Sequence, residues 1–286
     1  LVSDWSSGVS SSDLTISREA MRECERIAIQ DWGIPSRLLM ENAGREVVGE
    51  VLRFLRAEKA GRAVREAVGL DTAPLGTGLD NPSSQKPRTV EELQDWKDGL
   101  SRVRGPICVV CGPGNNGGDG MVVARTLLNH GVMVDCVFAG SAGQLEADND
   151  LGANARLLKR CGGAILVIEK ADGLEALSRR LDGAMICVDA LFGTGLARPL
   201  EGLHFAFVEA MNRADRPCIS VDIPSGIDAN TGQVLGAAIM ADVTVTFAAA
   251  KHGLFRGAGP DHTGRVRVAE IGIPRSLVDA AVATGA

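Results

Sequence analysis

The sequence is poor in aromatic residues: only 3% of its 286 residues are aromatic, and tyrosine is absent. A stacking platform for single-stranded nucleic acid needs several aromatic side chains, so this composition argues against one. Basic residues are also in the minority, with 30 Lys and Arg against 36 Asp and Glu and a formal net charge of −6. A broad nucleic-acid surface requires a concentration of Lys and Arg, which the sequence does not have. We therefore expect no nucleic-acid partner.

Long apolar runs are missing as well. None approaches the roughly 18–20 residues that a membrane-spanning helix requires. Hydrophobic residues make up 45% of the chain and charged residues 23%, which is ordinary for a soluble globular protein. The sequence therefore predicts a soluble protein without a membrane span.

The seven cysteines are odd in number, and several lie inside apolar runs. Buried, reduced thiols in an intracellular compartment explain this better than a disulfide framework, and both cytoplasm and mitochondrion stay open. Because the chain begins at Leu1 rather than Met, we expect a segment to precede it. Cys108 and Cys111 have C-x-x-C spacing, but residues three apart on a strand point to opposite faces. A structural role is therefore favoured over a redox or metal-binding pair.

Apolar runs of strand length alternate with helix-compatible segments from residue 106 onward. The expected strands are Ile107–Val110, Val132–Phe138, Ala164–Ile168, Met185–Val188, Cys218–Val221 and Asp242–Phe247, with Arg265–Val268 at an edge. The expected helices between them are Asp119–His130, Ala147–Arg160, Gly173–Leu181 and Leu203–Arg213. This alternation predicts a doubly wound α/β fold, a mostly parallel sheet with helices on both faces.

Two further helices are expected before the sheet, one beginning near Ser17 and one running from Pro35 to Leu55. We expect a flexible tail over 1–16, one domain over 17–275 and a C-terminal tail over 276–286. Residues 59–105 contain a stretch rich in Gly, Pro and Ser, which indicates a surface insertion rather than a domain boundary.

The loop Cys111–Gly120, CGPGNNGGDG, follows the first of these strands. Its glycines allow a tight turn, and free amides at the start of the next helix suit a phosphate. A conventional dinucleotide site also needs an acidic residue at the end of the second strand, and Asp135 is expected in mid-strand instead. The G-x-G-x-x-G match alone is therefore weak.

Two later loops, VDALFGTGLARPLEG and VDIPSGIDANTG, begin with aspartates that end strands, Asp189 and Asp222. Either aspartate alone is equally well explained as a cap or turn residue. Together with Asn116, they bring oxygen-bearing side chains from three strand ends to one crevice, with no His or Cys nearby in sequence, and Ser225 follows Asp222 by three residues. Such a set favours a hard cation, K⁺, Na⁺, Mg²⁺ or Ca²⁺, over zinc. Whether Lys251 faces this crevice stays open.

Taken together, these loops resemble the NAD(P)HX epimerase family, also called the YjeF N-terminal domain. The resemblance runs from about Ser17 to Pro274 and includes AMRECERIAIQDWGIPSRLLMENAG, TVTFAAAKHGL and VAEIGIP. It implies a Rossmann-like domain, commonly a homodimer, that interconverts the R and S forms of hydrated NADH and NADPH, NADHX and NADPHX. A separate dehydratase that uses ATP or ADP then restores the cofactor from the S form.

The resemblance also assigns a site. It places substrate binding at Asn115, Asn116, Gly117, Gly118, Asp119, Gly193, Thr194, Gly195, Leu196, Ala197, Arg198, Pro199 and Asp222. It implies one potassium ion per subunit, held by Asn116, Asp189 and Ser225. The long segment 59–105 and the sequence AAAKHG depart from the family, and neither is expected to touch the site.

The reacting carbon of such a substrate is a carbinolamine carbon. The lone pair of the ring nitrogen can expel hydroxide to give a planar iminium ion, and water can add again from the other face. This route needs a proton donor and acceptor, and a negative environment for the cation. We expect Asp222 to take the acid/base role, with a pKa raised by burial.

Two alternatives remain. The protein could be a non-catalytic scaffold or complex subunit that binds a protein partner through residues 59–105. It could also be a hydride-transferring dehydrogenase, which would bind intact NAD(P)H without K⁺. The sequence does not identify residues that choose between NADHX and NADPHX.

Overall fold

A seven-stranded parallel sheet forms the centre of the computed structural model, which describes residues 15–68 and 105–283 and, within α2, side chains up to residue 55. The strand order is β4-β3-β2-β5-β6-β7-β9. The strands are β2 (Ile107–Cys111), β3 (Val134–Ala139), β4 (Ile165–Ile168), β5 (Ile186–Ala190), β6 (Cys218–Val221), β7 (Val243–Phe247) and β9 (Arg265–Ala269). Because β3 and β4 extend from one side of β2, and β5 and the later strands from the other, the winding reverses between β2 and β5. Such a switch point opens a crevice beyond the carboxyl ends of the strands.

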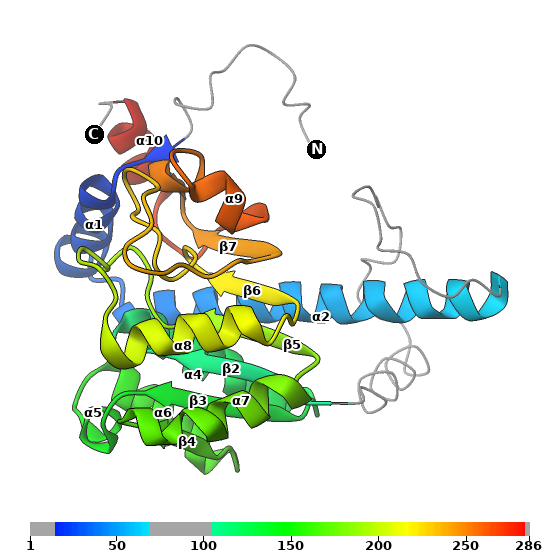
Figure 1. Ribbon diagram of the computed structural model, residues 1–286. Coiled ribbons are helices and arrows are strands. Elements are labelled where there is room, and N and C mark those ends of the chain that lie inside the picture. Colours follow the sequence, from blue (N-terminus) through cyan, green and yellow to red (C-terminus); the bar gives the residue numbers. More distant parts are fainter. Residues whose placement is uncertain (1–14, 69–104, 284–286) are drawn as a thin grey trace, which may run out of the picture.

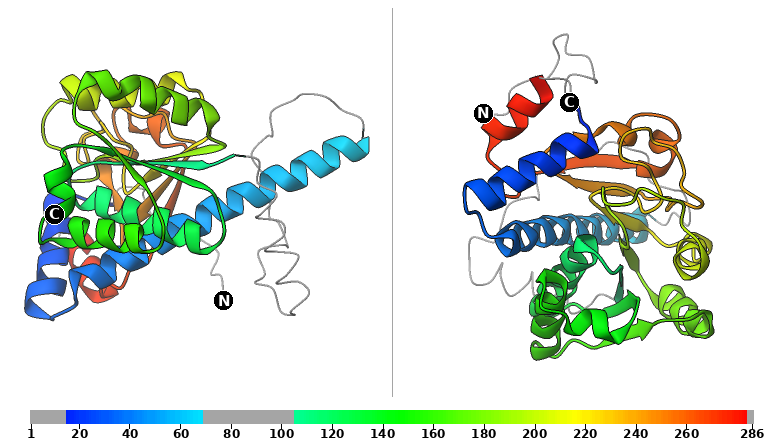
Figure 2. Two further views of the ribbon diagram at one scale, coloured as in Figure 1. Left: turned by 90° about the horizontal axis from the view of Figure 1, so that it is seen from below. Right: turned by 90° about the vertical axis from the view of Figure 1, so that its left-hand side faces the viewer.

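Helices cover both faces of the sheet (Figure 2). The long α2 (Ser36–Val68), α4 (Asn115–Asn129) and α6 (Asp150–Arg160) pack on one side, and α7 (Leu174–Gly183) and α8 (Gly202–Arg213) on the other. Strand β2 contributes Cys111 to the first core and Cys108 to the second, so the C-x-x-C pair is split as expected. The predicted doubly wound fold is confirmed, and Arg265–Ala269 does form an edge strand.

The N-terminal helix α1 (Arg18–Arg26) lies beyond the strand ends, on the side to which the strand arrows point (Figure 1). Its first turn is capped by Ser17, whose hydroxyl oxygen accepts a hydrogen bond from the amide of Ala20 at 3.1 Å. A π-helical turn, Ile27–Asp31, continues it before α2 begins. The short strand β1 (Thr15–Ile16) pairs in parallel with β8 (Ala250–Lys251). The last helix, α10 (Arg275–Ala283), packs against α1.

Several element limits differ from those expected. Thr15 and Ile16 belong to a strand rather than a tail, because Ile16 is fully buried where β1 meets β8. Residues 275–283 form α10, which buries Val278, instead of a C-terminal tail. Helix α2 continues to Val68, because its last part is rich in the strong helix formers Ala, Glu, Lys and Arg. The rest of the expected insertion, residues 69–104, lies outside the described residues, as do residues 1–14.

The glycine-rich loop is also shorter than expected, because α4 begins at Asn115 rather than Asp119. The remaining described elements are two short helices, α5 (Ala142–Glu146) and α9 (Gly259–Thr263), and two 3₁₀ turns, Ala171–Gly173 and His252–Leu254. Within the described ranges, no helix has both the length and the apolar character needed to cross a membrane.

Candidate functional site

Three segments that follow strands meet at the switch point. A Cβ on Gly112, after β2, would lie 1.9 Å from the carbonyl oxygen of Leu191, after β5, so only glycine allows these two segments to approach. A Cβ on Gly193 would lie 2.7 Å from Oδ2 of Asp222 and 3.1 Å from Oδ1 of Asn116. The structure therefore brings Asn116, Asp222 and the Gly193 loop together, as the sequence predicted.

Asp222 follows β6 directly and has a left-handed backbone, with φ of +69°. Non-glycine residues rarely adopt this conformation, and where they do the position is often functional. The backbone is held there because the amide of Asp222 donates to the carbonyl oxygen of Val245 at 2.8 Å. The carboxyl group is buried, and its Oδ2 accepts a hydrogen bond from the amide of Thr194 at 3.0 Å.

Lys251 forms an ion pair with this carboxylate, at 2.6 Å between Nζ and Oδ1 of Asp222. The lysine is 1% exposed, and its Nζ also donates to Oγ1 of Thr246 and to the carbonyl oxygen of Phe247, both at 3.0 Å. Lys251 thus faces the crevice, and the expectation that AAAKHG does not touch the site is wrong. The chain bends at Ala248, where φ is +60°, and sends the short strand β8 back toward Asp222.

The pKa of Asp222 differs from expectation. Burial raises it, but the positive charge of Lys251 and the hydrogen bonds from Lys251 and Thr194 lower it by more, so the net pKa is below its ordinary value. The expected raised pKa is therefore wrong. The sequence did not reveal that a lysine 29 residues later would reach the same carboxyl group.

Asp119, in the first turns of α4, is a carboxyl group of the crevice whose pKa is shifted upward. Burial raises its pKa well above the ordinary value, and the nearby charges of Asp222 and Glu25 raise it further, against the opposing charge of Lys251. Two carboxyl groups in one crevice thus have pKa values shifted in opposite directions, a pattern typical of acid/base sites.

Glu25 is a group that sequence reasoning did not select. It lies on α1 and is half-buried. Burial raises its pKa, and so does the charge of Asp222, while Lys251 and Arg22 lower it. The only signal in the sequence is helical spacing, because positions 18, 22 and 25 share one face of α1.

Asp189 and Ser225 are in contact at the end of β5, with 2.5 Å between Oγ of Ser225 and Oδ1 of Asp189. Asp189 is fully buried and also accepts hydrogen bonds from the amides of Ser225 and Leu191 and from the Ser220 hydroxyl. Burial raises its pKa, and these hydrogen bonds oppose the rise. Among residues with described side chains, no Lys or Arg forms an ion pair with it, so a bound cation would suit this carboxyl group.

The third residue that the resemblance assigned to the cation, Asn116, is buried against the Gly193 loop. Its Nδ2 has no hydrogen-bond partner within the described chain, which leaves this amide available to a ligand. Where the structure describes side chains, no three His, Cys, Asp or Glu residues converge on a metal position. The oxygen atoms on offer are those of Asp189, Ser225, Asn116 and the carbonyl of Phe192, which lies 3.1 Å from Oγ of Ser225.

The remaining assigned residues lie around the crevice. Asn115, Gly117 and Gly118 form the first turn of α4, whose N-cap Gly114 has no side chain that could bond the first amides of the helix. In the Gly193–Pro199 loop, Leu196 is buried while Gly195 and residues 197–199 are exposed at the rim.

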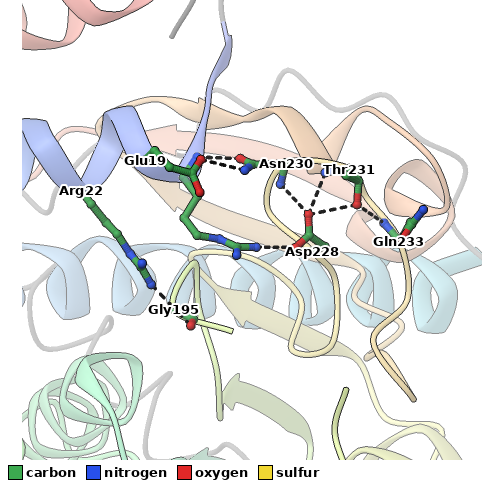
Figure 3. A network of polar contacts seen from close by, with 8 residues as sticks. Glu19, Arg22, Gly195, Asp228, Asn230, Thr231 and Gln233 are labelled. Carbon is green, nitrogen blue, oxygen red and sulfur yellow. Dashed lines mark hydrogen bonds and ion pairs between the residues drawn. The ribbon is translucent and has the colours of Figure 1, made fainter. Parts of the chain in front are cut away.

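Helix α1 is tied to two of the three segments. Arg18, which is buried, forms an ion pair with Asp228, and its amide donates to Oδ1 of Asn230 at 2.7 Å. Figure 3 shows Asn230 reaching Glu19, and Arg22 pointing from α1 to Gly195, whose carbonyl oxygen lies 3.5 Å from the guanidinium group. Helix α1 therefore forms a wall of the crevice.

A reversed strand order with buried oxygen-bearing side chains at the reversal defines a Rossmann-like ligand-binding protein. The chain belongs to the family described as YjeF-related protein N-terminus, whose sequence pattern matches residues 36–253. This match confirms the resemblance found in the sequence.

Curated relatives extend the comparison. The chain is 31% identical to the NAD(P)H-hydrate epimerase of Limosilactobacillus reuteri, over 90% of this chain and 95% of that protein. It is 34% identical to the bifunctional NAD(P)H-hydrate repair enzyme Nnr of Moorella thermoacetica, over 90% of this chain but only 40% of that protein. The chain thus spans less than half the length of this bifunctional relative. The crystal structure of the yeast protein YNL200c shares the fold, with a TM-score of 0.64, 21% identity and 93% of each chain covered.

Proposed function

We propose that the protein is an epimerase that interconverts the R and S forms of hydrated NADH and NADPH. The observation that carries the proposal is the ion pair of Asp222 with Lys251 in one buried crevice with Asp119, where the pKa of Asp222 is lowered and the pKa of Asp119 is raised. The names of the relatives, which include NAD(P)H-hydrate epimerases from Weissella koreensis and Limosilactobacillus reuteri, support it.

The opposite pKa shifts of Asp119 and Asp222 suit the two proton transfers of the reaction. Loss of the hydroxyl group from the carbinolamine carbon requires a proton, which Asp119 can give, and leaves a planar iminium cation. The ionised Asp222 stabilises this cation and accepts a proton when water adds again. Lys251 keeps Asp222 ionised and fixed in place, so that Asp222 serves as base rather than as the acid first expected.

The nucleotide part of the substrate has its own binding elements. The uncapped amides at the start of α4, from Asn115 onward, suit a phosphate group because they carry the positive end of the helix dipole. The exposed rim of the Gly193–Pro199 loop lies next to this helix start, and its amide at Thr194 already contacts Asp222. Binding of the phosphates would thus place the reduced ring near the carboxyl groups.

A potassium ion fits the Asp189–Ser225 pair, with Asn116 as the third ligand. Oxygen atoms alone, one of them from a buried carboxylate without an ion-pair partner in the described chain, form a set that suits a hard cation. When bound, the ion would neutralise Asp189 and hold the segments after β5 and β6 together.

Four points on oligomeric state, dehydratase, compartment and protein partner accompany the proposal. A homodimer and a separate dehydratase that consumes the S form follow from the family. The six buried and one exposed free cysteines support a reducing, intracellular compartment. A protein partner that binds at residues 59–105 is also part of the proposal. Of this segment, the structure describes only residues 59–68, the end of α2.

A coupled assay tests the activity. Mixed R and S NADHX is incubated with a dehydratase and its nucleotide, and NADH is followed with and without this protein. We expect the protein to carry the reaction to completion, where the dehydratase alone stalls after the S form is consumed. A stall that persists with K⁺ present and the protein folded would reject the epimerase and favour the scaffold.

The variant Asp222→Asn tests whether Asp222 acts as the base. Asn tolerates the left-handed backbone that Asp222 adopts, so the variant changes charge with little change in conformation. We expect the rate to fall by roughly 10²-fold or more, within the usual range for loss of an acid/base group. A rate within about threefold of the wild-type rate would remove Asp222 from this role.

The dehydrogenase alternative receives no support from the site. Asp135 lies inside β3 and forms an ion pair with Arg180, at 2.5 Å, rather than standing at the strand end where a ribose would bind. Tight binding of intact NADH with hydride transfer to an acceptor would reopen this alternative.

A further inference from the structure

Epimerisation as proposed above requires proton transfer on both faces of the substrate ring. Because the cation is planar, water must leave from one face and enter from the other for the configuration to invert. Asp119 and Asp222 both stand at the carboxyl edge of the sheet, one in the first turns of α4 and one directly after β6. We expect both to approach a bound ring from this edge, so that proton transfer on the other face calls for a further group.

The wall opposite this edge is α1. The helix lies beyond the strand ends (Figure 1) and is fixed there by the ion pair of Arg18 with Asp228 and by the contact of Arg22 with Gly195. The rim at Gly195 is otherwise open, since the guanidinium group of Arg22 is the nearest atom that a Cβ there would meet, at 4.0 Å. The exposed rim of the loop thus faces α1 across the crevice.

Glu25 is the carboxyl group that α1 adds to this space. It follows Arg22 by three residues and Arg18 by seven, so it shares their helix face. The charged groups that act on it are Asp222, Lys251 and Arg22, and it acts in turn on Asp119. Its neighbour Glu23 is exposed instead and pairs with Arg26 at 2.8 Å.

We infer that Glu25 is a third proton-transferring residue, which serves the ring face turned to α1 while the Asp119–Asp222 pair serves the face turned to the sheet edge. This inference rests on the proposed function. Glu25 gives its proton to the hydroxyl group, the C–O bond breaks with both electrons on oxygen, and water leaves as the nitrogen lone pair forms the C=N bond. A water on the other face then bonds through oxygen to this carbon, the C=N electrons return to nitrogen, and the released proton passes to Asp222. In the reverse direction, the sheet-edge pair donates and the Glu25 carboxylate accepts.

The test measures two reactions of Glu25→Gln in ¹⁸O-labelled water: epimerisation of NADHX, and exchange of its hydroxyl oxygen without inversion. We expect epimerisation to fall by about 10²-fold. Exchange of the hydroxyl oxygen of one epimer with labelled water should stay within about threefold of the wild-type rate. The Asp119–Asp222 pair can still release and re-add water on its own face. Glu23→Gln, which makes the same change on the exposed side of α1, should leave both reactions and the melting temperature unchanged.

Other outcomes decide against the inference. Epimerisation by Glu25→Gln near the wild-type rate, or a parallel loss of exchange and epimerisation in a variant that melts like the wild type, would overturn it. If Glu25→Gln does not fold, Glu25→Asp keeps the proton on a shorter side chain, and a slower epimerisation with normal exchange is then expected; equal losses would overturn the inference. If the wild-type protein itself shows neither reaction above the protein-free rate, the proposed function fails, and not only the role of Glu25.

Discussion

Single residues in the crevice differ in charge state because their surroundings differ, although Asp119, Asp189 and Asp222 have the same side chain and are all buried. Asp222 is paired with Lys251, so its pKa is lowered. Burial raises the pKa of Asp119, the charges of Asp222 and Glu25 raise it further, and the charge of Lys251 opposes them only in part. Burial alone would have raised both pKa values, and the position of one ammonium group separates them.

The raised pKa of Asp119 predicts a pH-dependent cost in stability. The unfolded chain ionises this group near pH 4, whereas the folded protein retains the proton to higher pH, so the free energy of unfolding falls as pH rises between the two pKa values. Asp119→Asn cannot ionise and should therefore melt at a higher temperature than the wild type at pH 8, with the difference shrinking toward pH 4. Each 1 kcal/mol should appear as roughly 2–4 °C for a protein of this size.

Thermal melting of both proteins across this pH range, in one ionic strength, measures the effect. Asp148→Asn offers a control outside the crevice. A difference between wild type and Asp119→Asn that does not grow with pH would contradict the shifted pKa.

Among the elements, α1 supplies the side of the crevice that the sheet does not provide. Its Ser17 cap and its contacts with Asp228, Asn230 and Gly195 fix it across the crevice, and α10 supports it from the other side. The helix therefore converts an open sheet edge into a site with two walls.

Loosening α1 should weaken substrate binding more than it weakens the fold. In Arg18→Met, the half-buried carboxylate of Asp228 loses its ion-pair partner but keeps the hydrogen bonds from Asn230 and Thr231, so the cost should stay below about 3–5 kcal/mol, which is typical of a fully buried pair. We expect KM for NADHX to rise and amide hydrogen exchange in residues 18–26 to accelerate. Arg26→Met, on the exposed face of the same helix, removes two surface ion pairs, with Glu23 and Asp31, which contribute little to stability because they are exposed, and should change neither. Equal exchange rates in the two variants would show that the Arg18 ion pair does not hold α1.

At the scale of the whole molecule, the reversal between β2 and β5 gathers distant segments at one point. Residues near 25, 119, 189, 222 and 251 meet there because parallel strands end at the same edge and short connections follow each of them. The buried Asp189–Ser225 contact ties the segments after β5 and β6 together, so a cation bound there would act on the stability of the entire edge.

Potassium should therefore stabilise the protein as well as support its activity. A ligand that binds only the folded state raises stability by RT ln(1 + [L]/Kd), so 100 times Kd should add about 2.7 kcal/mol. The melting temperature should rise when K⁺ replaces tetramethylammonium at constant ionic strength, and Asp189→Asn should remove the rise. An equal rise in wild type and Asp189→Asn would place any K⁺ effect elsewhere.

Periodicity and turn chemistry in the sequence by themselves determined the doubly wound sheet, its strands to within about two residues, and the three segments that carry the oxygen-bearing side chains. Those signals are local, since apolar strands, helix spacing and glycine-rich turns are visible within a dozen residues. The family resemblance also followed from local motifs in a fixed order, and the family match bears it out.

Only the tertiary structure decided the charge state of Asp222, the place of Lys251 and the position of Glu25. Each of these depends on residues far apart in the chain: 29 positions separate Asp222 from Lys251, and α1 reaches a loop 173 positions away from Arg22. Electrostatic energies vary with distance in space and with burial, and neither can be read from spacing along a chain. The crevice could thus be located from the sequence, but its acid, base and second wall are products of the fold.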